Sequence, residues 1–268
     1  MSAAAAFDAA GLQAARTGAW GEGLQAHASL GSTQDAALAL VEAGAAEGCV
    51  VLAEAQSAGR GRWGKAWEGR PGLSLLFTVA IQAPPAAAGA GPASPTLPLA
   101  LGLASVQALR GLGLGAAACK WPNDLWLGDR KLGGLLVEQR GPWLLAGCGL
   151  NVGQGADDWA GELKASAISL AQAGLALPRE AVLAALLAAW ERALARWRAG
   201  GLAAFLDEWA QADALAGRHC RLRQGGRAFE ALVLGLAADG ALRVRLLGGE
   251  EARLYSAEVE HVRPLGPR

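Results

Sequence analysis

Apolar side chains recur at helical spacing in several parts of the chain. The clearest amphipathic helix is predicted over residues 179–198, where one face is almost wholly apolar. Residues 99–112 carry little charge and predict a well-buried helix, and residues 202–212 predict a shorter one. A further helix is predicted to begin at Ser32, whose hydroxyl can cap the first-turn amides, with Asp35 as the acid of a shortened capping box.

Shorter apolar runs, bounded by glycine and proline, predict strands. In the first part of the chain these runs are residues 49–53, 73–82, 117–121, 124–127, 131–139 and 143–150. Gly128 and Asp129 separate two of them and are typical of a hairpin turn. Residues 1–23, 56–72, 83–98 and 151–164 are rich in small, glycine or proline residues and predict irregular connections.

After residue 216 the pattern changes to short strands separated by glycine-containing turns. The predicted strands are residues 218–223, 228–236, 241–247 and 259–263. This spacing is typical of a small β-barrel. We therefore expect two domains, residues 1–216 and residues 217–268.

Composition narrows the class of protein. The chain of 268 residues is 53% hydrophobic and 18% charged, which excludes a disordered protein. Its 24 basic and 24 acidic residues balance, so bulk charge does not favour nucleic acid or an anionic membrane. The N-terminus lacks the basic start of a signal peptide, and the longest apolar run is too short to span a bilayer.

The four cysteines are scattered, which makes a zinc site unfavourable and indicates reduced thiols in the core. These features together lead us to expect a cytoplasmic protein without a metal bound by its own side chains. No Ser-His-Asp or Cys-His arrangement and no Walker A loop is present. The site should therefore work by placing charges and orienting its ligands, without a protein nucleophile.

A basic, glycine-rich segment over residues 59–67 is the first candidate for chemistry. Its sequence is G-R-G-R-W-G-K-A-W, in which the glycines allow backbone amides to face an anion and the basic residues add positive charge. A loop around a phosphate- or carboxylate-bearing ligand and a solvated or RNA-binding Arg/Gly segment are about equally compatible with its composition. The two tryptophans favour a ligand loop.

Three other segments carry polar residues that could bind a ligand. They are residues 120–124 with Lys131, the strand end at Asn151, and the helix start at Ser32 and Thr33. In residues 120–124 (K-W-P-N-D) an Asn-Asp pair follows the strand predicted over residues 117–121, and Lys131 lies across the predicted hairpin from this pair. Two glycines in the strand before Asn151 indicate the close approach of a flat ligand or another backbone. Each segment also has a purely structural interpretation: a hairpin turn, a softened strand, and a helix cap at Ser32 and Thr33.

Taken in their order along the chain, these four segments resemble the biotin protein ligase family. The resemblance extends over most of the chain and is carried by the G-R-G-R-x-G-x-x-W loop and the K-W-P-N-D…K-L-x-G-x-L-x-E block. It implies a mixed sheet flanked by helices, followed by a small SH3-like β-barrel, an α+β fold. It also implies an ATP-dependent ligase that forms biotinyl-5′-AMP and transfers biotin to a lysine of a biotin carboxyl carrier protein.

The resemblance assigns two groups of residues. Those expected to bind biotin are Ser32, Thr33, Gln56, Gly59, Arg60, Arg62, Trp67, Lys131 and Gly134. Those expected to bind ATP with its Mg²⁺ are Arg62, Lys65, Asn123, Asp124, Asn151 and Trp159. Among them Lys131, Arg62 and Asp124 are expected to be catalytic. Asn151 would recognise adenine, and Trp159 would stack there.

The chain departs from the family pattern at a few positions. Gln34 stands where Asn is common, and Lys65 stands where Arg is common. Only 31 residues precede Ser32 and they carry no helix-turn-helix pattern, so we expect the monofunctional type, which binds neither DNA nor a membrane, as a monomer or homodimer. A lipoate or octanoate ligase or transferase, a non-catalytic RNA-binding protein and a biotin sensor are the alternatives.

Overall fold

The larger part of the molecule is built on a seven-stranded sheet. The computed structural model describes residues 7, 8, 11, 13, 18–84, 95–255 and 258–262. The strands of the sheet are β1 (Gln25–Leu30), β2 (Val50–Gln56), β3 (Ser74–Gln82), β4 (Ala117–Lys120), β5 (Asp124–Leu127), β6 (Arg130–Arg140) and β7 (Trp143–Asn151). Their order is β1-β2-β3-β7-β6-β5-β4. Because β1 runs parallel to β2 while the other neighbours are antiparallel, the sheet is mixed.

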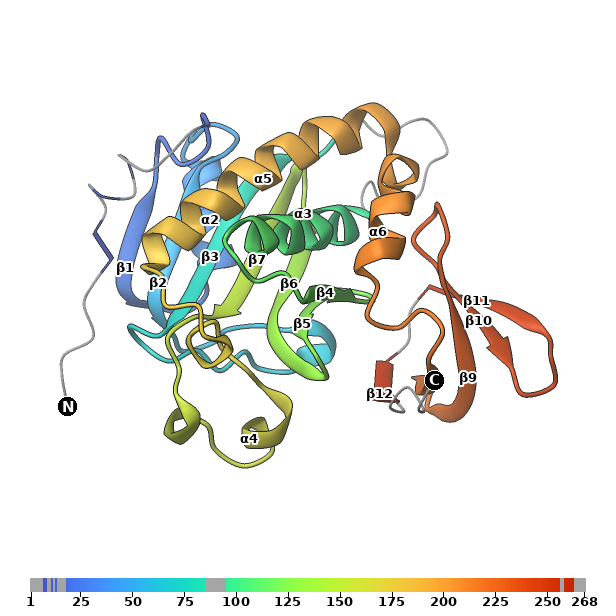
Figure 1. Cartoon of the computed structure of the whole chain (residues 1–268). Coiled ribbons are helices and arrows are strands. Elements are labelled where there is room, and N and C mark those ends of the chain that lie inside the picture. The colour runs from blue at the N-terminus through green and yellow to red at the C-terminus, as the bar shows by residue number, and fades with distance from the viewer. Residues whose placement is uncertain are drawn as a thin grey trace.

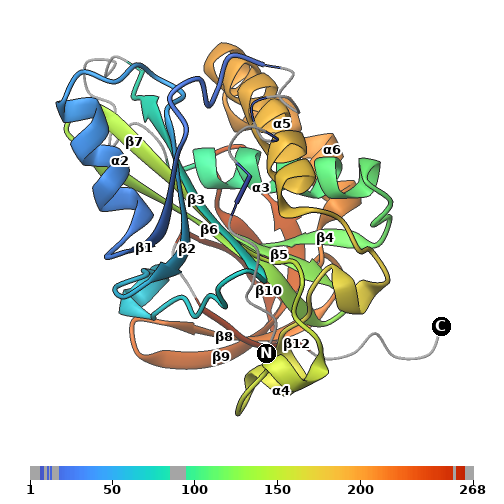
Figure 2. The same cartoon turned by 90° about the vertical axis from the view of Figure 1, so that its left-hand side faces the viewer.

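Helices cover both faces of this sheet (Figures 1 and 2). On one face α3 (Leu97–Gly111) and α5 (Arg179–Gly200) pack together above the largest part of the core. On the other face α2 (Thr33–Glu42) covers a smaller cluster that includes Val51 and Leu145. β3 is buried along nearly its whole length because helices lie on both of its faces. Short elements complete the chain: η1 (Arg62–Gly64), η2 (Ala156–Asp158), α4 (Leu163–Ser166), η3 (Ala171–Ala173), η4 (Leu202–Phe205) and α6 (Leu206–Ala212).

A second, antiparallel sheet follows α6 (Figure 1). It contains β8 (His219–Gln224), β9 (Arg227–Leu236), β10 (Leu242–Leu246), β11 (Glu251–Leu254) and β12 (Glu258–Val262), in the order β11-β10-β9-β8-β12. Its inward side chains join the same hydrophobic cluster as the larger sheet. Trp121 Nε1 donates a hydrogen bond of 3.0 Å to Gly240 O across the junction. The small sheet is therefore packed firmly against the end of the larger one.

Most of the predicted elements are present, and the α+β fold with a small C-terminal β domain is confirmed. Two strands, β1 and β11, were not predicted. β1 lies at the edge of its sheet and is mostly exposed or half-buried, so it lacks the apolar run that marks an interior strand. The helix expected over residues 202–212 begins instead as the 3₁₀ turn η4.

Some expectations fall partly outside the described residues. This holds for the irregular connections over residues 1–23 and 83–98. The division into domains after residue 216 stays a prediction. In the part of the chain that the structure describes, no helix has the length and apolar character needed to cross a bilayer.

Candidate functional site

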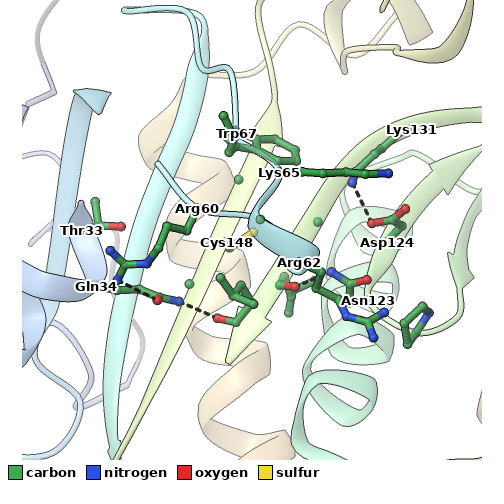
Figure 3. A pocket seen from close by; sticks show the side chains of 18 of the residues that line it. Thr33, Gln34, Arg60, Arg62, Lys65, Trp67, Asn123, Asp124, Lys131 and Cys148 are labelled. Atoms are coloured by element: carbon green, nitrogen blue, oxygen red, sulfur yellow. Dashed lines mark hydrogen bonds and ion pairs between the residues drawn. The ribbon is translucent and has the colours of Figure 1, made fainter. Parts of the chain in front are cut away.

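A cavity of about 300 Å³ lies over β6 and β7, where the glycine-rich loop, the start of α2 and the β4–β5 turn meet (Figure 3). It brings together eleven of the predicted site residues: Ser32, Thr33, Gln56, Arg60, Arg62, Lys65, Trp67, Asn123, Asp124, Lys131 and Gly134. Three predicted residues, Gly59, Asn151 and Trp159, do not line it. Its size is at the lower end of the range for small-molecule sites.

One end of the cavity is formed by uncharged polar side chains. The amide nitrogen and hydroxyl of Thr33 both donate to Gln56 Oε1, at 2.7 and 3.1 Å, and Thr78 Oγ1 donates to Thr33 Oγ1 at 2.8 Å. Ser32 Oγ accepts a hydrogen bond from Gln34 N, as expected of a helix cap. Ser32, Thr33 and Gln56 offer donors and acceptors without charge, which suits an uncharged polar ring, while the guanidinium group of the nearby Arg60 is paired with Asp35 and Glu138.

The expected capping box at the start of α2 does not form. Asp35 pairs instead with Arg60 of the glycine-rich loop, with both nitrogen–oxygen distances at 2.8 Å. The hydrogen bonds from Arg60 hold the pKa of the Asp35 carboxyl below its usual value, against a smaller effect of burial. The loop is thereby tied to the helix that carries the polar end of the cavity.

The glycines of the loop allow its backbone to fold back on itself. Gly61 N donates to Lys65 O at 2.7 Å, and Trp67 N donates to Gly59 O at 3.1 Å. A Cβ atom at Gly61 would lie 3.0 Å from Lys65 O, so a side chain there would disturb this closure. Gly59 therefore shapes the loop from outside the cavity.

Trp67 closes the cavity against β7. A Cβ atom placed on Gly149 would lie 2.2 Å from Cε2 of the Trp67 indole, so the ring occupies the space that any other residue would fill. The glycine-rich strand had predicted a flat ligand or another backbone. That interpretation was wrong at Gly149, because the flat group is a tryptophan of this chain.

Charged side chains form the opposite end of the cavity. Lys131 Nζ lies 2.8 Å from Asp124 Oδ1 and 5.2 Å from the centre of the Trp67 ring. Lys120 Nζ lies 4.0 Å from the other oxygen of Asp124 and donates to Val259 O at 3.3 Å. Gly134 is adjacent, and its lack of a side chain leaves room for the pair of Asp124 and Lys131. One carboxylate thus lies between two ammonium groups.

Asn123 has a structural role in addition to its place on the cavity wall. Its Nδ2 donates to Leu135 O at 2.6 Å, while Leu135 N donates to Asn123 O at 2.9 Å. These bonds fix the turn before β5 against β6. Asn123 therefore sets the position of the neighbouring Asp124 carboxylate.

Asn151 lies beneath the cavity and supports the backbone of Lys131, at its charged end. It is only 5% exposed, and its Nδ2 donates to Ile168 O at 3.1 Å and to Lys131 O at 3.4 Å. In this arrangement its amide nitrogen is engaged by the backbone and is not presented to a ligand. Recognition of adenine by Asn151 stays a prediction. It would require Asn151 Nδ2 to give up these hydrogen bonds when the nucleotide binds.

Trp159 is buried on the far side of the glycine-rich loop. Its indole nitrogen donates to Gln172 Oε1 at 2.9 Å. Together with Trp67 and Gly59 it lines a second cavity of about 410 Å³. Trp67 thus separates the main cavity from the one that contains Trp159, and stacking of Trp159 on a nucleotide stays a prediction.

The cavity wall also contains residues outside the predicted set, among them Gln34, Lys120, Cys148 and Val259. Lys120 was visible as the first letter of the K-W-P-N-D motif, whereas the contribution of Val259 from the small sheet carries no local signal. Burial raises the pKa of the Cys148 thiol to about 12. Gln34 is buried and its Nε2 donates to Leu136 O at 2.8 Å, so it joins α2 to β6.

The described residues contain no cluster of three His, Cys, Asp or Glu side chains that suits a metal ion. Asp124 is the carboxylate at the charged end of the cavity. Mg²⁺ commonly uses one or two carboxylates together with substrate phosphates, and Asp124 fits that limited role.

Two family models match the chain. "Biotin/lipoate A/B protein ligase family" matches residues 28–153, and "Biotin protein ligase C terminal domain" matches residues 216–262. The "Bifunctional ligase/repressor BirA" of Escherichia coli is 33% identical over 225 residues, covering 79% of this chain and 68% of that protein. The "Biotin--[acetyl-CoA-carboxylase] ligase" of Mycobacterium tuberculosis is 32% identical over 247 residues, covering 88% of each.

Solved structures have the same fold. A biotin protein ligase from Aquifex aeolicus in complex with biotin and ATP has a TM-score of 0.76 and 24% identity, and the match covers 89% of this chain and 100% of that chain. The biotin protein ligase from Leishmania major in complex with biotin has a TM-score of 0.58 and 26% identity, covering 88% of this chain and 99% of that chain.

Proposed function

This chain belongs to the biotin protein ligase family and is a ligase, and from that premise and the geometry of its cavity we propose two half-reactions. In the first, an oxygen of the biotin carboxylate attacks the α-phosphorus of ATP. The bond from that phosphorus to its bridging oxygen breaks, so that biotinyl-5′-AMP forms and pyrophosphate leaves. In the second, a lysine amine of a biotin carboxyl carrier protein attacks the biotinyl carbonyl carbon, AMP leaves, and the amine loses a proton.

The observation that carries this proposal is the position of Lys131 at one end of a single cavity whose other end is polar and uncharged. Attack of a carboxylate on a phosphate brings two anions together and needs fixed positive charge. Lys131 would lie between the two anions and stabilise the charge that develops on the α-phosphate. Its ion pair with Asp124 would aim the ammonium group at this point before the ligand arrives.

Lys120 and Asp124 would support the same end of the cavity. The second ammonium group, held by Val259 O, adds positive charge near the leaving pyrophosphate. Asp124 would hold both lysines, contribute one ligand to the Mg²⁺ that arrives with ATP, and accept the proton of the incoming lysine amine. Arg62 and Lys65, in the loop wall, would face the phosphates.

The uncharged end would bind the ureido ring of biotin. That ring presents two N–H donors and one carbonyl acceptor, and Ser32, Thr33 and Gln56 supply hydroxyl and amide partners around it. The Trp67 indole would cover the body of the ligand and exclude water from the reactive mixed anhydride. Because the four cysteines are separate buried thiols, we place this reaction in a reducing compartment, the cytoplasm.

The first experiment measures pyrophosphate release with MgATP and either biotin or lipoate, without a carrier protein. We expect release with biotin and none with lipoate. Lys131→Ala should lower the rate by at least about 100-fold, the size of effect seen when one group that stabilises transition-state charge is removed. Lys164→Ala, at an exposed lysine of α4 outside the cavity, serves as the control and should leave the rate unchanged.

Other outcomes would replace the proposal. Release with lipoate would identify a lipoate-type ligase. Biotin binding without release, even with a carrier present, would indicate a sensor. Binding of RNA and of neither acid would favour the Arg/Gly interpretation of the loop. A folded Lys131→Ala protein that releases pyrophosphate at the wild-type rate would contradict the role given to Lys131.

A further inference from the structure

Arg60, in the glycine-rich loop, directs its guanidinium group toward α2 and β6, away from the charged end of the cavity (Figure 3). We propose that Asp35 and Glu138 are positioning residues of this ligase: they grip Arg60 and thereby hold the Gly59–Trp67 loop closed over the bound acid and its adenylate. The inference rests on the proposed function. It gives Arg60 a role through the position of the loop, not through the charge that it brings to the ligand.

Arg60, Asp35 and Glu138 together form a set of ion pairs on two sides of the loop, which we call the clamp. On the α2 side Arg60 Nη1 and Nη2 each lie 2.8 Å from an oxygen of Asp35. On the β6 side Arg60 Nε and Nη2 donate to the two oxygens of Glu138 at 3.2 and 3.4 Å. Planar, bidentate contacts of this kind fix orientation as well as distance. A single side chain therefore joins the loop to a helix and to the central sheet.

The loop needs such a contact with the rest of the protein because its described backbone hydrogen bonds only join loop residues to one another. Gly61 N donates to Lys65 O, Lys65 N to Arg62 O, and Trp67 N to Gly59 O, so these bonds make the loop a unit but do not tie it to the rest of the protein. Trp67 anchors one side of the unit against Gly149. Arg60 anchors the side that lies near the polar end of the cavity.

The side chains of the clamp are partly exposed, which suits a contact that must break when the loop opens. The side chain of Asp35 is 59% exposed, that of Arg60 33% and that of Glu138 21%. Ion pairs at such positions stabilise weakly and are screened by salt. Glu138 also pairs with Arg140 at 2.8 Å, so it stays fixed when Arg60 departs. The clamp should therefore set how long the ligand is retained and leave the chemical step unchanged.

The test uses Asp35→Asn and Glu138→Gln, which keep shape but remove charge, with Glu42→Gln on the exposed end of the same helix as control. Biotin dissociation should become faster by about 1.4- to 5-fold in each variant, the range expected for an exposed pair worth about 0.2–1 kcal/mol. The rate of adenylate formation at saturating biotin should not change. Raised salt should reproduce the effect in the wild type and have less effect in the variants.

A double-mutant cycle with Arg60→Ala separates the clamp from a direct contact. If the clamp acts through Arg60, Asp35→Asn should add little once Arg60 has been removed. If Arg60 binds the ligand directly, freeing it from Asp35 should strengthen biotin binding or leave it unchanged; if Asp35 acts on biotin binding without Arg60, the two substitutions should act independently. Either of these last results would overturn the proposal.

Amide hydrogen exchange measured without ligand tests the clamp independently of the proposed function. Amide hydrogen exchange at Gly61 and Trp67 should be faster in both variants than in the wild type and in Glu42→Gln. Unchanged exchange in the variants would overturn the clamp even if biotin activation is established. If the wild type binds no biotin, the proposed function fails, whatever the exchange shows.

Discussion

At the scale of single residues, the indole of Trp67 packs directly against the backbone of Gly149. The glycine is needed because the aromatic ring occupies the place of its missing side chain. The sequence signals both residues, but it does not show that they touch, since they lie 82 positions apart in the chain. Their contact shows why a glycine inside a buried strand is tolerated here.

Gly149→Ala should therefore displace the indole and open the cavity. We expect the KM for biotin to rise about tenfold and the stability to fall by about 1–3 kcal/mol, as for other overpacked sites. Steady-state kinetics and urea unfolding measure the two effects. Gly102→Ala is the matched control, because a Cβ there meets nothing within 4 Å and should stabilise α3 slightly. Unchanged biotin kinetics in Gly149→Ala would contradict the fit.

The thiol of Cys148, on the cavity wall, should be inert at neutral pH. Burial raises its pKa to about 12, so about one molecule in ten thousand carries the thiolate at pH 8. Labelling by iodoacetamide, followed by mass spectrometry, should accelerate about tenfold for each pH unit between 7 and 9. Biotin should slow labelling of Cys148 but not of Cys220, in the small sheet, whose pKa is raised to about 11 chiefly by burial. Rapid labelling at pH 7 would contradict this.

At the scale of elements, a buried ion pair joins β2, the turn before β3 and the start of α5. Arg179 Nη1 and Nη2 lie 2.7 and 2.8 Å from the two oxygens of Glu54, which also accepts from Gly72 N at 2.8 Å. Burial would raise the pKa of Glu54, but the bonds from Arg179 and Gly72 outweigh it, and the pKa is lowered. The pair therefore fixes Gly72, at the end of the irregular connection over residues 56–72, against β2 and α5.

Arg179→Met should destabilise the protein by about 3 kcal/mol at pH 7, because the Glu54 charge remains buried without its partner. Adding Glu54→Gln should recover part of this loss. Since the folded pKa of Glu54 is lowered, its contribution is complete above the usual pKa of about 4.3 and disappears as the pH falls through the folded value. Urea unfolding of the wild type and Glu54→Gln should therefore differ at pH 7 and converge toward pH 3. A constant difference would contradict the assignment.

Local patterns predict elements better than they predict what an element touches. The β5–β6 hairpin follows from Gly128 and Asp129, and α5 follows from its apolar stripe, because both signals are local. β1 escapes prediction because an exposed edge strand needs no apolar run. The positions of Asn151 under Lys131 and of Asp35 on Arg60 depend on contacts between distant segments. A single sequence therefore suggests which residues form the site but not which of them hold the others in place.

At the scale of the whole molecule, the two sheets share one hydrophobic core. Leu222, Val233 and Leu242 of the small sheet belong to the same buried cluster as Trp121 and Trp209. The small sheet also reaches the site, since Val259 lines the cavity and its carbonyl holds Lys120. Because these contacts cross the junction, we expect the small sheet to unfold together with the rest of the chain and not as an independent unit.

Gly240→Val tests this coupling at the junction itself. Gly240 has a φ of +86°, and a Cβ atom there would lie 3.1 Å from Thr96 Cγ2 and 3.2 Å from Leu99 Cδ1, so the substitution strains both backbone and packing. We expect stability to fall by about 2–4 kcal/mol, with one transition shared by tryptophan fluorescence and by hydrogen exchange in β9.

Fluorescence reports the larger part of the molecule, because all ten tryptophans precede residue 217, whereas β9 reports the small sheet. Gly248→Val, where a Cβ meets nothing within 4 Å, should leave both signals unchanged. If Gly240→Val released β9 while fluorescence kept its wild-type midpoint, the small sheet would be a separate folding unit. Adenylate formation would then be expected to fail through loss of the Val259 contact to Lys120 while the larger sheet remained folded.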